Sequence, residues 1–341
     1  MTPPPFATYW ARQLGAPEES LIQLHGGINN RVYKFGEGTT SRVVKGYRDI
    51  ELEKPDRMGA EVSFLNYSAL VAPNYVPRLF HVDSQRRCII IEYLEGTKFT
   101  EGEPVTQSEV QTAKDFYRKL NEHSKLAQQM ITLDAKDGFL RLSEHITNVR
   151  HRISEMGIDH LPDRNQNNAK QLLILLSRLI DLVGDWVNHL ITDSKINDSI
   201  DIRQRCVSPS DFGFHNAIKT KDGIKFFDFE FSGWDDPAKT SIDFMLQPRV
   251  SMKFVQTPID QVFSESPDTK SQLRAVALNL ILRLKWVCIH LAILRRDFLL
   301  ELTWVNPNQN YDQLYDSRLR NASNRLLECE TLVNSTVIAR R

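Results

Sequence analysis

The sequence lacks several features that mark whole classes of protein. Lys plus Arg and Asp plus Glu both number 43 in 341 residues, so there is no basic excess of the kind that nucleic-acid binders carry. No Gly-x4-Gly-Lys-Ser/Thr or Gly-x-Gly-x-x-Gly sequence occurs, which argues against P-loop and Rossmann proteins. The four cysteines, at positions 88, 206, 288 and 329, match neither a metal-binding nor a disulfide-framework spacing, so we expect reduced cysteines.

Long uncharged hydrophobic runs are missing as well. The two most apolar stretches both carry charged or ionisable side chains, Arg178, Asp181 and Asp185 in 172–191 and Arg283, Lys285 and His290 in 275–294, so we predict buried helices and no membrane span. The first six residues lack a basic region followed by an apolar core, which predicts no secretory signal and a cytoplasmic protein. The sequence gives no indication of oligomeric state.

The most informative segment is Ser208-Pro-Ser-Asp-Phe-Gly-Phe-His-Asn216, with Asp228-Phe-Glu-Phe231 twelve residues later. Between them, two short strand-like runs, 217–219 and 224–227, flank an Asp-Gly pair, which predicts a β-hairpin. A hairpin returns its ends to the same place, so Asn216 and Asp228 should emerge side by side. Their hard oxygen atoms suit Mg²⁺, and Asp211 lies where it can accept a proton from a hydroxyl group.

A matching phosphate-binding half is expected in the first third of the chain. Strand-like runs at 21–24 and 31–35 are joined by a loop that contains Gly26, Gly27, Asn29 and Asn30. Glycines let the backbone approach phosphates closely, and asparagines tolerate unusual dihedral angles and offer amide donors. An ordinary β-turn is the alternative interpretation of this loop.

Lys45 lies on a third strand-like run, 42–47, from which it can face the α- and β-phosphates; a solvated lysine is the alternative. Apolar residues recur at helical spacing from Met58 to Ala69, with Asp56 as a plausible N-cap. Glu61 lies at the edge of this stripe, which favours it over Glu51 and Glu53 as the partner of Lys45. Further on, 78–82 is another strand-like run, and an apolar strand-like run at 88–94 ends in a predicted hinge, where backbone groups from Glu92 to Leu94 can bind an adenine edge.

These motifs resemble the aminoglycoside phosphotransferase and choline kinase superfamily, which consists of small-molecule kinases with a protein-kinase-like fold. Its catalytic loop is His-Gly-Asp or His-Asn-Asp with an Asn five residues after the Asp, matched here by Asp211 and Asn216. Its metal motif resembles Phe227-Asp-Phe-Glu230. One departure is Pro209, which stands where the family has His.

The resemblance implies an α+β, bilobal fold with ATP and Mg²⁺ as cofactors. It predicts an N-lobe over residues 1–96, with a small antiparallel sheet and one helix, and a larger, mainly helical C-lobe over 97–341. Helices are expected at 108–125, 142–156, 172–191 and 275–294. The predicted function is phosphoryl transfer to a hydroxyl of a small molecule such as an amino alcohol (choline, for example), a sugar or an aminoglycoside.

Four residues are candidates for contacting the acceptor: Glu230, Trp234, Trp286 and His290. Trp286 and His290 are one helical turn apart, and an aromatic wall with nearby acids suits a cationic amine. A tryptophan in an apolar helix is more often part of the core. A nucleotide-binding pseudokinase, suggested by Pro209, is the alternative function. A kinase acting on proteins is disfavoured because no Ala-Pro-Glu-like segment follows Asp228.

Overall fold

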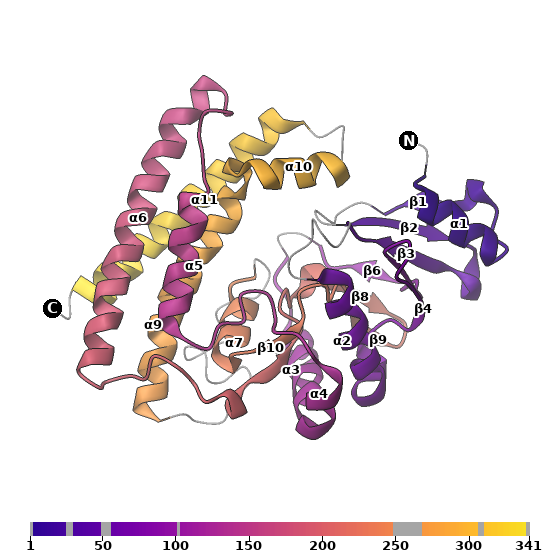
Figure 1. Cartoon of the computed structure of the whole chain (residues 1–341), viewed down its shortest axis with the longest axis horizontal. Helices are drawn as coiled ribbons and strands as arrows, with labels where there is room; N and C mark the ends of the chain where they lie inside the picture. Colours follow the sequence, from indigo (N-terminus) through magenta and orange to yellow (C-terminus); the bar gives the residue numbers. More distant parts are fainter. Residues whose placement is uncertain are drawn as a thin grey trace. The chain divides into compact units, whose positions relative to one another are not determined.

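The chain folds into two compact units, which Figure 1 displays as a computed structural model. The structure describes residues 3–24, 30–48, 56–100, 103–247, 268–305 and 310–338. Unit 1 comprises Met1–Gly138, Cys206–Asp235 and Asp243–Phe254, and unit 2 comprises Phe139–Arg205, Asp236–Ile242 and Val255–Arg341. This division differs from the lobe boundary expected at residue 96, which stays a prediction.

Unit 1 contains a five-stranded antiparallel sheet in the order β1-β2-β3-β5-β4. All five strands were expected from the sequence, and only their ends differ by a few residues. Lys45 on β3 pairs with Val32 on β2 and Ile89 on β5, which fixes it at the centre of the sheet. The strands are β1 Ile22–Gln23, β2 Arg31–Phe35, β3 Arg42–Gly46, β4 Leu79–Asp83 and β5 Cys88–Glu92.

Helix α2, Arg57–Val71, is the predicted helix between β3 and β4. It buries Met58, Glu61 and Leu65, which lie three and four residues apart and so share one face. Asp56 occupies the N-cap position as expected, but its side chain accepts no capping hydrogen bond. Burial of its apolar face, rather than side-chain capping, therefore accounts for where this helix packs.

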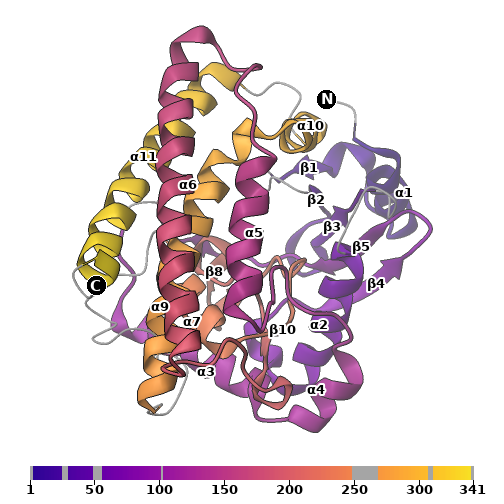
Figure 2. The ribbon, with the colours of Figure 1, turned by 60° about the vertical axis from the view of Figure 1, so that its left-hand side comes forward.

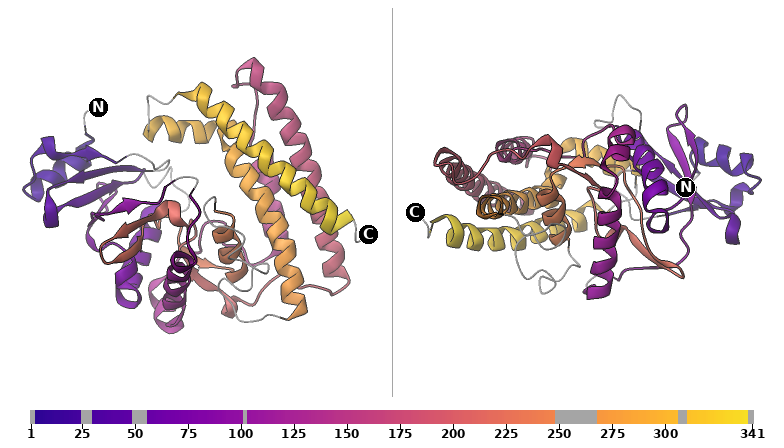
Figure 3. Two further views of the ribbon diagram at one scale, coloured as in Figure 1. Left: turned by 180° about the vertical axis from the view of Figure 1, so that it is seen from behind. Right: turned by 90° about the horizontal axis from the view of Figure 1, so that it is seen from below.

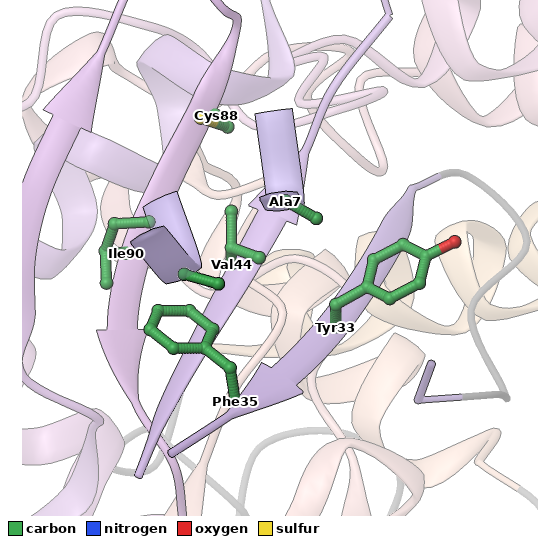
Figure 4. Close-up of a cluster of buried hydrophobic side chains, with 7 residues drawn as sticks. Ala7, Tyr33, Phe35, Val44, Cys88 and Ile90 are labelled. Carbon is green, nitrogen blue, oxygen red and sulfur yellow. The ribbon is translucent and has the colours of Figure 1, made fainter. Parts of the chain in front are cut away.

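The sequence did not predict helix α1, Pro5–Gln13, which packs on the sheet. Figure 4 shows this contact, where Ala7 lies among side chains of three strands. Gly46 ends β3 directly beneath the ring of Phe6, and a side chain at position 46 would overlap that ring. The buried cluster consists of Ala7, Ala11, Tyr33, Phe35, Val44, Cys88 and Ile90.

The rest of unit 1 consists of the segment from Cys206 to Asp235 and the elements that pack beside it. The predicted hairpin is present as β8, Ala217–Thr220, and β9, Gly223–Phe226, with β6, Thr97–Lys98, beside β8. Strand β7, Cys206–Ser208, pairs with β10, Gly233–Asp235. The helix expected at 108–125 is two helices, α3 Gln107–Asn121 and α4 Ser124–Met130. Phenylalanine rings pack against one another around Phe226 of β9, mostly in tilted or edge-to-face pairs: Phe64, Phe116, Phe212, Phe214, Phe226, Phe229 and Phe244.

Unit 2 is helical in the part of the chain that the structure describes. Four of its helices pack side by side (Figure 2): α5 Leu142–Ser154, α6 Asp163–Thr192, α9 Thr269–His290 and α11 Tyr311–Val333. Helix α11 was not predicted. Shorter helices are α7 Pro237–Met245, which begins in this unit, η8 Leu291–Leu294 and α10 Arg296–Val305.

One described helical segment, Thr269–Leu294, is long and apolar enough to cross a membrane by length and composition. The ionisable side chains in 275–294 were therefore not enough by themselves to exclude a membrane-spanning helix. The structure supplies a second criterion, since 67% of its most apolar window is buried inside the fold. Such burial is typical of the core helix of a helical bundle.

Candidate functional site

The β8–β9 hairpin brings Asn216 and Asp228 to the same end, as the sequence predicts. Ala217 pairs with Phe226, and the backbone N–H of Phe227 donates to the carbonyl oxygen of Asn216 at 3.0 Å. The Asn216 side chain is buried, and its Nδ2 donates to the backbone oxygen of Asp211 at 3.1 Å and to its Oδ2 at 3.3 Å. Asn216 therefore holds Asp211 and the hairpin together.

Asp211 lies on the loop before the hairpin, with 43% of its side chain exposed. His215 Nε2 lies 3.3 Å from its Oδ1. Burial raises the pKa of Asp211, but the hydrogen bond and charge of His215, the Asn216 amide and the charge of Lys136 together bring that pKa below its usual value. Asp211 is thus ionised at neutral pH, as a group that accepts a proton must be.

Two residues of this segment have left-handed backbone conformations that are unusual for side chains other than glycine. Ser210 has φ +64° and Asp228 has φ +67°. The backbone N–H of Ser210 donates to Ser208 Oγ at 3.0 Å, which helps to fix the turn. Such conformations are rare and concentrate at functional sites, so their presence at Asp228 and immediately before Asp211 is informative.

Lys45 is the centre of a buried ion-pair network. Its Nζ lies 2.6 Å from Glu61 Oε2, pairs with Asp228 Oδ1, and lies 4.0 Å from Glu230 Oε2. Burial lowers the pKa of Lys45, but the charges of Asp228, Glu61 and Glu230 outweigh burial and raise it. Lys45 is only 5% exposed and Glu61 only 1%, so this lysine is not a solvated one. The predicted Lys45–Glu61 pair is present.

Glu230 adds a third carboxylate to the network. Asn30 Nδ2 donates a hydrogen bond to Glu230 Oε2, which links the start of β2 to the metal motif. Burial and the charge of Asp228 raise the pKa of Glu230 to about 7, against the opposing charges of Lys45 and Arg57. A bound cation would favour the ionised form of this side chain.

A cavity of about 380 Å³ lies over this network and is lined by residues of unit 1. Its volume is in the range of small-molecule pockets. Val43 and Lys45 are two residues apart on β3, so their side chains lie on the same side of the sheet and both line the cavity. Its walls combine apolar side chains with the ionic network: Val32, Val43, Ile91, Leu94, Ile218, Lys45, Glu61, Asn216, Asp228 and Glu230 are among them.

The expected nucleotide-binding residues fall into two groups. Asn30, Glu92 and Leu94 line the cavity, and the Glu92 carboxylate accepts from Lys225 Nζ at 3.0 Å. Gly26, Gly27 and Asn29 lie outside the described residues, so their predicted contact with phosphates is not tested by the structure.

Sequence reasoning missed three residues of this site. Tyr47 donates from its hydroxyl to Glu61 Oε2 at 2.6 Å, and its spacing of two from Lys45 in the predicted strand-like run 42–47 could have identified it. His215 immediately precedes Asn216 and lines the cavity. Lys136, whose charge acts on Asp211, comes from a segment 75 positions earlier that no local pattern links to it.

The expected acceptor residues occupy different places. Trp234 lies on β10 in the interior of unit 1, 7% exposed, where its Nε1 donates to the carbonyl oxygen of Ile131 at 2.9 Å. This packing does not favour the acceptor contact predicted for it. Glu230 lines the cavity, whereas Trp286 and His290 lie one turn apart on α9 in unit 2. Their contact with an acceptor stays a prediction.

Comparison with known proteins gives matches among solved structures alone, since no family model and no curated protein matches the chain. A spectinomycin phosphotransferase in complex with ADP and spectinomycin is 13% identical, with a TM-score of 0.58 over 91% of this chain and 93% of its own. A choline/ethanolamine kinase family protein from Mesorhizobium loti is 16% identical, with a TM-score of 0.55 over 98% of this chain and 97% of its own.

An amicoumacin kinase in complex with AMP-PNP, Ca²⁺ and Ami is 10% identical, with a TM-score of 0.52 over 92% of this chain and 93% of its own. At such identities the likeness establishes the fold. The predicted α+β, protein-kinase-like fold class of the small-molecule kinases is therefore confirmed, and the similar structures come from the superfamily that the motifs resemble.

Proposed function

We propose that this protein is a kinase that transfers the γ-phosphoryl group of ATP to a hydroxyl group of a small molecule. The observation that supports it best is Lys45, held by Glu61 at 2.6 Å and paired with Asp228 on the wall of a cavity that Asn216 also lines. A buried lysine, a partner that positions it and two oxygen ligands are the parts that phosphoryl transfer requires. The fold shared with small-molecule kinases supports the proposal.

The donors around Asp228 fit Mg²⁺. Because Asn216 Nδ2 donates to Asp211, its amide is oriented with Oδ1 available as a metal ligand beside the Asp228 carboxylate. Among the described residues, no group of three His, Cys, Asp or Glu side chains is arranged to hold a metal alone. The remaining ligands would be phosphate oxygens and water, as is usual for Mg²⁺, which when bound neutralises phosphate charge.

Each remaining residue has a proposed role in this account. Asp211 orients the acceptor hydroxyl and accepts its proton. Lys45 contacts the α- and β-phosphates, while Glu61 and Tyr47 hold Lys45 in place. Backbone groups near Glu92 and Leu94 bind the adenine edge, and phosphate contacts are proposed for Gly26, Gly27, Asn29 and Asn30. The acceptor class, whether amino alcohol, sugar or aminoglycoside, is open at this level.

An ADP-release screen across amino alcohols, sugars and aminoglycosides tests this function. With an acceptor in hand, we expect Asp211→Asn to lower kcat by about 10²–10⁴ while AMP-PNP affinity stays within about threefold, because the base acts in the chemical step. Asp222→Asn is the matched control, since Asp222 is an exposed residue of the hairpin turn.

Unchanged turnover in Asp211→Asn would contradict the assigned role. Mg²⁺-dependent AMP-PNP binding without turnover on any acceptor would instead favour the pseudokinase, the alternative to which Pro209 points.

A further inference from the structure

Helices α9 and α11 of unit 2 bring together a group of cationic and aromatic side chains (Figure 3, left, where α9 is orange and α11 yellow). Trp286 and His290 lie one turn apart on α9. Arg318 and Arg325 lie seven residues apart on α11, so they share a face of that helix. Arg325 lies over the ring of Trp286 at 5.1 Å from its centroid. We call these four residues the α9–α11 cluster.

His290 is uncharged in this cluster and its polar atoms are unused. Neither ring nitrogen is exposed or has a hydrogen-bond partner among the described residues. Burial, together with the charges of Arg325 and Arg318, lowers the pKa of His290 to about 4. A neutral imidazole carries one N–H donor, and here that donor points into the protein without an acceptor.

Arg318, which is partly buried, has no partner for its guanidinium group in the part of the chain that the structure describes. It forms no ion pair or hydrogen bond with any described residue, and burial alone lowers its pKa. Burial lowers the pKa of Arg325, and outside the cluster the charge of Arg283 lowers it further. Glu328 is the acid that acts on Arg325. The two charges that lower the pKa of His290 are both guanidinium groups, those of Arg325 and Arg318, so the surroundings of His290 are positive.

We propose that the α9–α11 cluster binds an oxyanion group, either a phosphate, a sulfate or a carboxylate. Guanidinium groups present paired donors that match oxyanion geometry, and a partly desolvated site strengthens such charge-assisted bonds. Binding would give Arg318 and His290 a hydrogen-bond acceptor that no described residue supplies. The same geometry argues against the cationic amine expected at Trp286, because Arg325 already lies over that ring.

The proposal does not depend on catalysis, so it is tested first by binding. Inorganic phosphate is titrated at constant ionic strength, with chloride as the balancing salt, and the ring C2 proton resonances of the nine histidines are followed by NMR. His290→Gln assigns the His290 resonance. We expect that resonance to shift saturably, and its titration midpoint to move upward, because a bound anion favours the imidazolium form.

Matched arginine variants show whether the cluster is the site. Arg318→Gln should weaken phosphate binding at the His290 resonance at least about tenfold, since a charge-assisted contact is lost. Arg320→Gln should leave it within about twofold, because Arg320 is an exposed residue on the same helix. No saturable shift of His290, or equal binding in Arg318→Gln, would overturn the proposal.

The oxyanion can be free in solution or part of the phosphoryl acceptor. Matched acceptors separate the two sources, for example glucose against gluconate and glucose 6-phosphate in the ADP-release assay. A roughly tenfold rise of KM in Arg318→Gln that is confined to the anionic acceptors assigns the oxyanion to the acceptor. An unchanged KM, with phosphate binding as above, assigns it to a free anion. Absence of all turnover would contradict the proposed kinase activity and leave the binding result standing.

Discussion

At the scale of single residues, the site is defined by side chains held in costly arrangements. Ser210 and Asp228 adopt left-handed backbone angles, and Lys45 is buried among three carboxylates. Each arrangement disfavours folding unless the surrounding structure enforces it. Their concentration around Asp211 and Asn216 is expected of a site selected for chemistry rather than for stability.

Ser210 offers a direct test of the backbone strain. Replacing it with glycine should raise the free energy of unfolding by about 0.5–1 kcal/mol. The left-handed conformation costs an ordinary residue about 1–2 kcal/mol, and glycine avoids this cost. Part of the gain is lost because glycine gives the unfolded chain more conformational entropy. Its hydroxyl forms no hydrogen bond among the described residues, so none is lost. Urea unfolding measures the change.

The matched control is Ser63→Gly on α2, where the same substitution should destabilise by roughly 0.5 kcal/mol because the backbone is helical. Equal effects at both positions would contradict the strain at Ser210.

His290 predicts a pH dependence of stability. Its folded pKa, about 4, lies below the unfolded value of 6.5, so the unfolded chain binds more protons between these values. The contribution of the neutral His290 side chain to the free energy of unfolding is therefore complete above about pH 7 and is lost as the pH falls towards 4. Allowing for partial exposure, the loss is roughly 1–2 kcal/mol.

Urea unfolding at pH 7, 6, 5 and 4 in His290→Gln should show a shallower acid decline than the wild type. His151→Gln, at an exposed position on α5, should follow the wild-type curve. An unaltered acid decline in His290→Gln would mean that the imidazole titrates normally.

At the scale of elements, the periodicity of apolar residues was enough to predict the position of a side chain wherever a single strand or helix determines that position. The five strands, the β8–β9 hairpin and the Lys45–Glu61 pair follow from alternation and helical spacing. Helix α11 was missed although Leu319, Leu326 and Val333 are buried at helical spacing, because polar residues dominate its composition. The pairing of His215 with Asp211 depends on loop geometry that no periodicity encodes.

Strand β7 shows how one side chain supports an element. Asn121 accepts from the Val207 N–H at 2.8 Å and donates to the Val207 carbonyl oxygen at 3.1 Å, so it replaces a neighbouring strand on that edge. Asn121→Ala leaves both buried groups unpaired and should destabilise by about 2–4 kcal/mol in urea unfolding.

Gln111→Ala, at an exposed position on the same helix, should change stability by less than about 0.5 kcal/mol. A comparably small effect of Asn121→Ala would show that water replaces the amide.

At the scale of the whole molecule, sequence identity and fold carry different information. Structures only 10–16% identical share the fold, yet the acidic and lysine positions that define the candidate site were found from short motifs. The acceptor could not be predicted in the same way, because no short motif of this sequence identifies the residues that contact it. The interior position of Trp234 is an example, since its indole bonds to Ile131 rather than lining the cavity.

The central claim is that the cavity of unit 1 holds a magnesium-bound nucleoside triphosphate, and calorimetric titration with AMP-PNP tests it most directly. We predict saturable binding to the wild type that strengthens with Mg²⁺, at least about tenfold weaker Mg²⁺-dependent binding in Asp228→Asn, and wild-type binding in Asp222→Asn. Absence of saturable binding in the wild type, or Asp228→Asn binding as tightly as the wild type with Mg²⁺, would contradict the account.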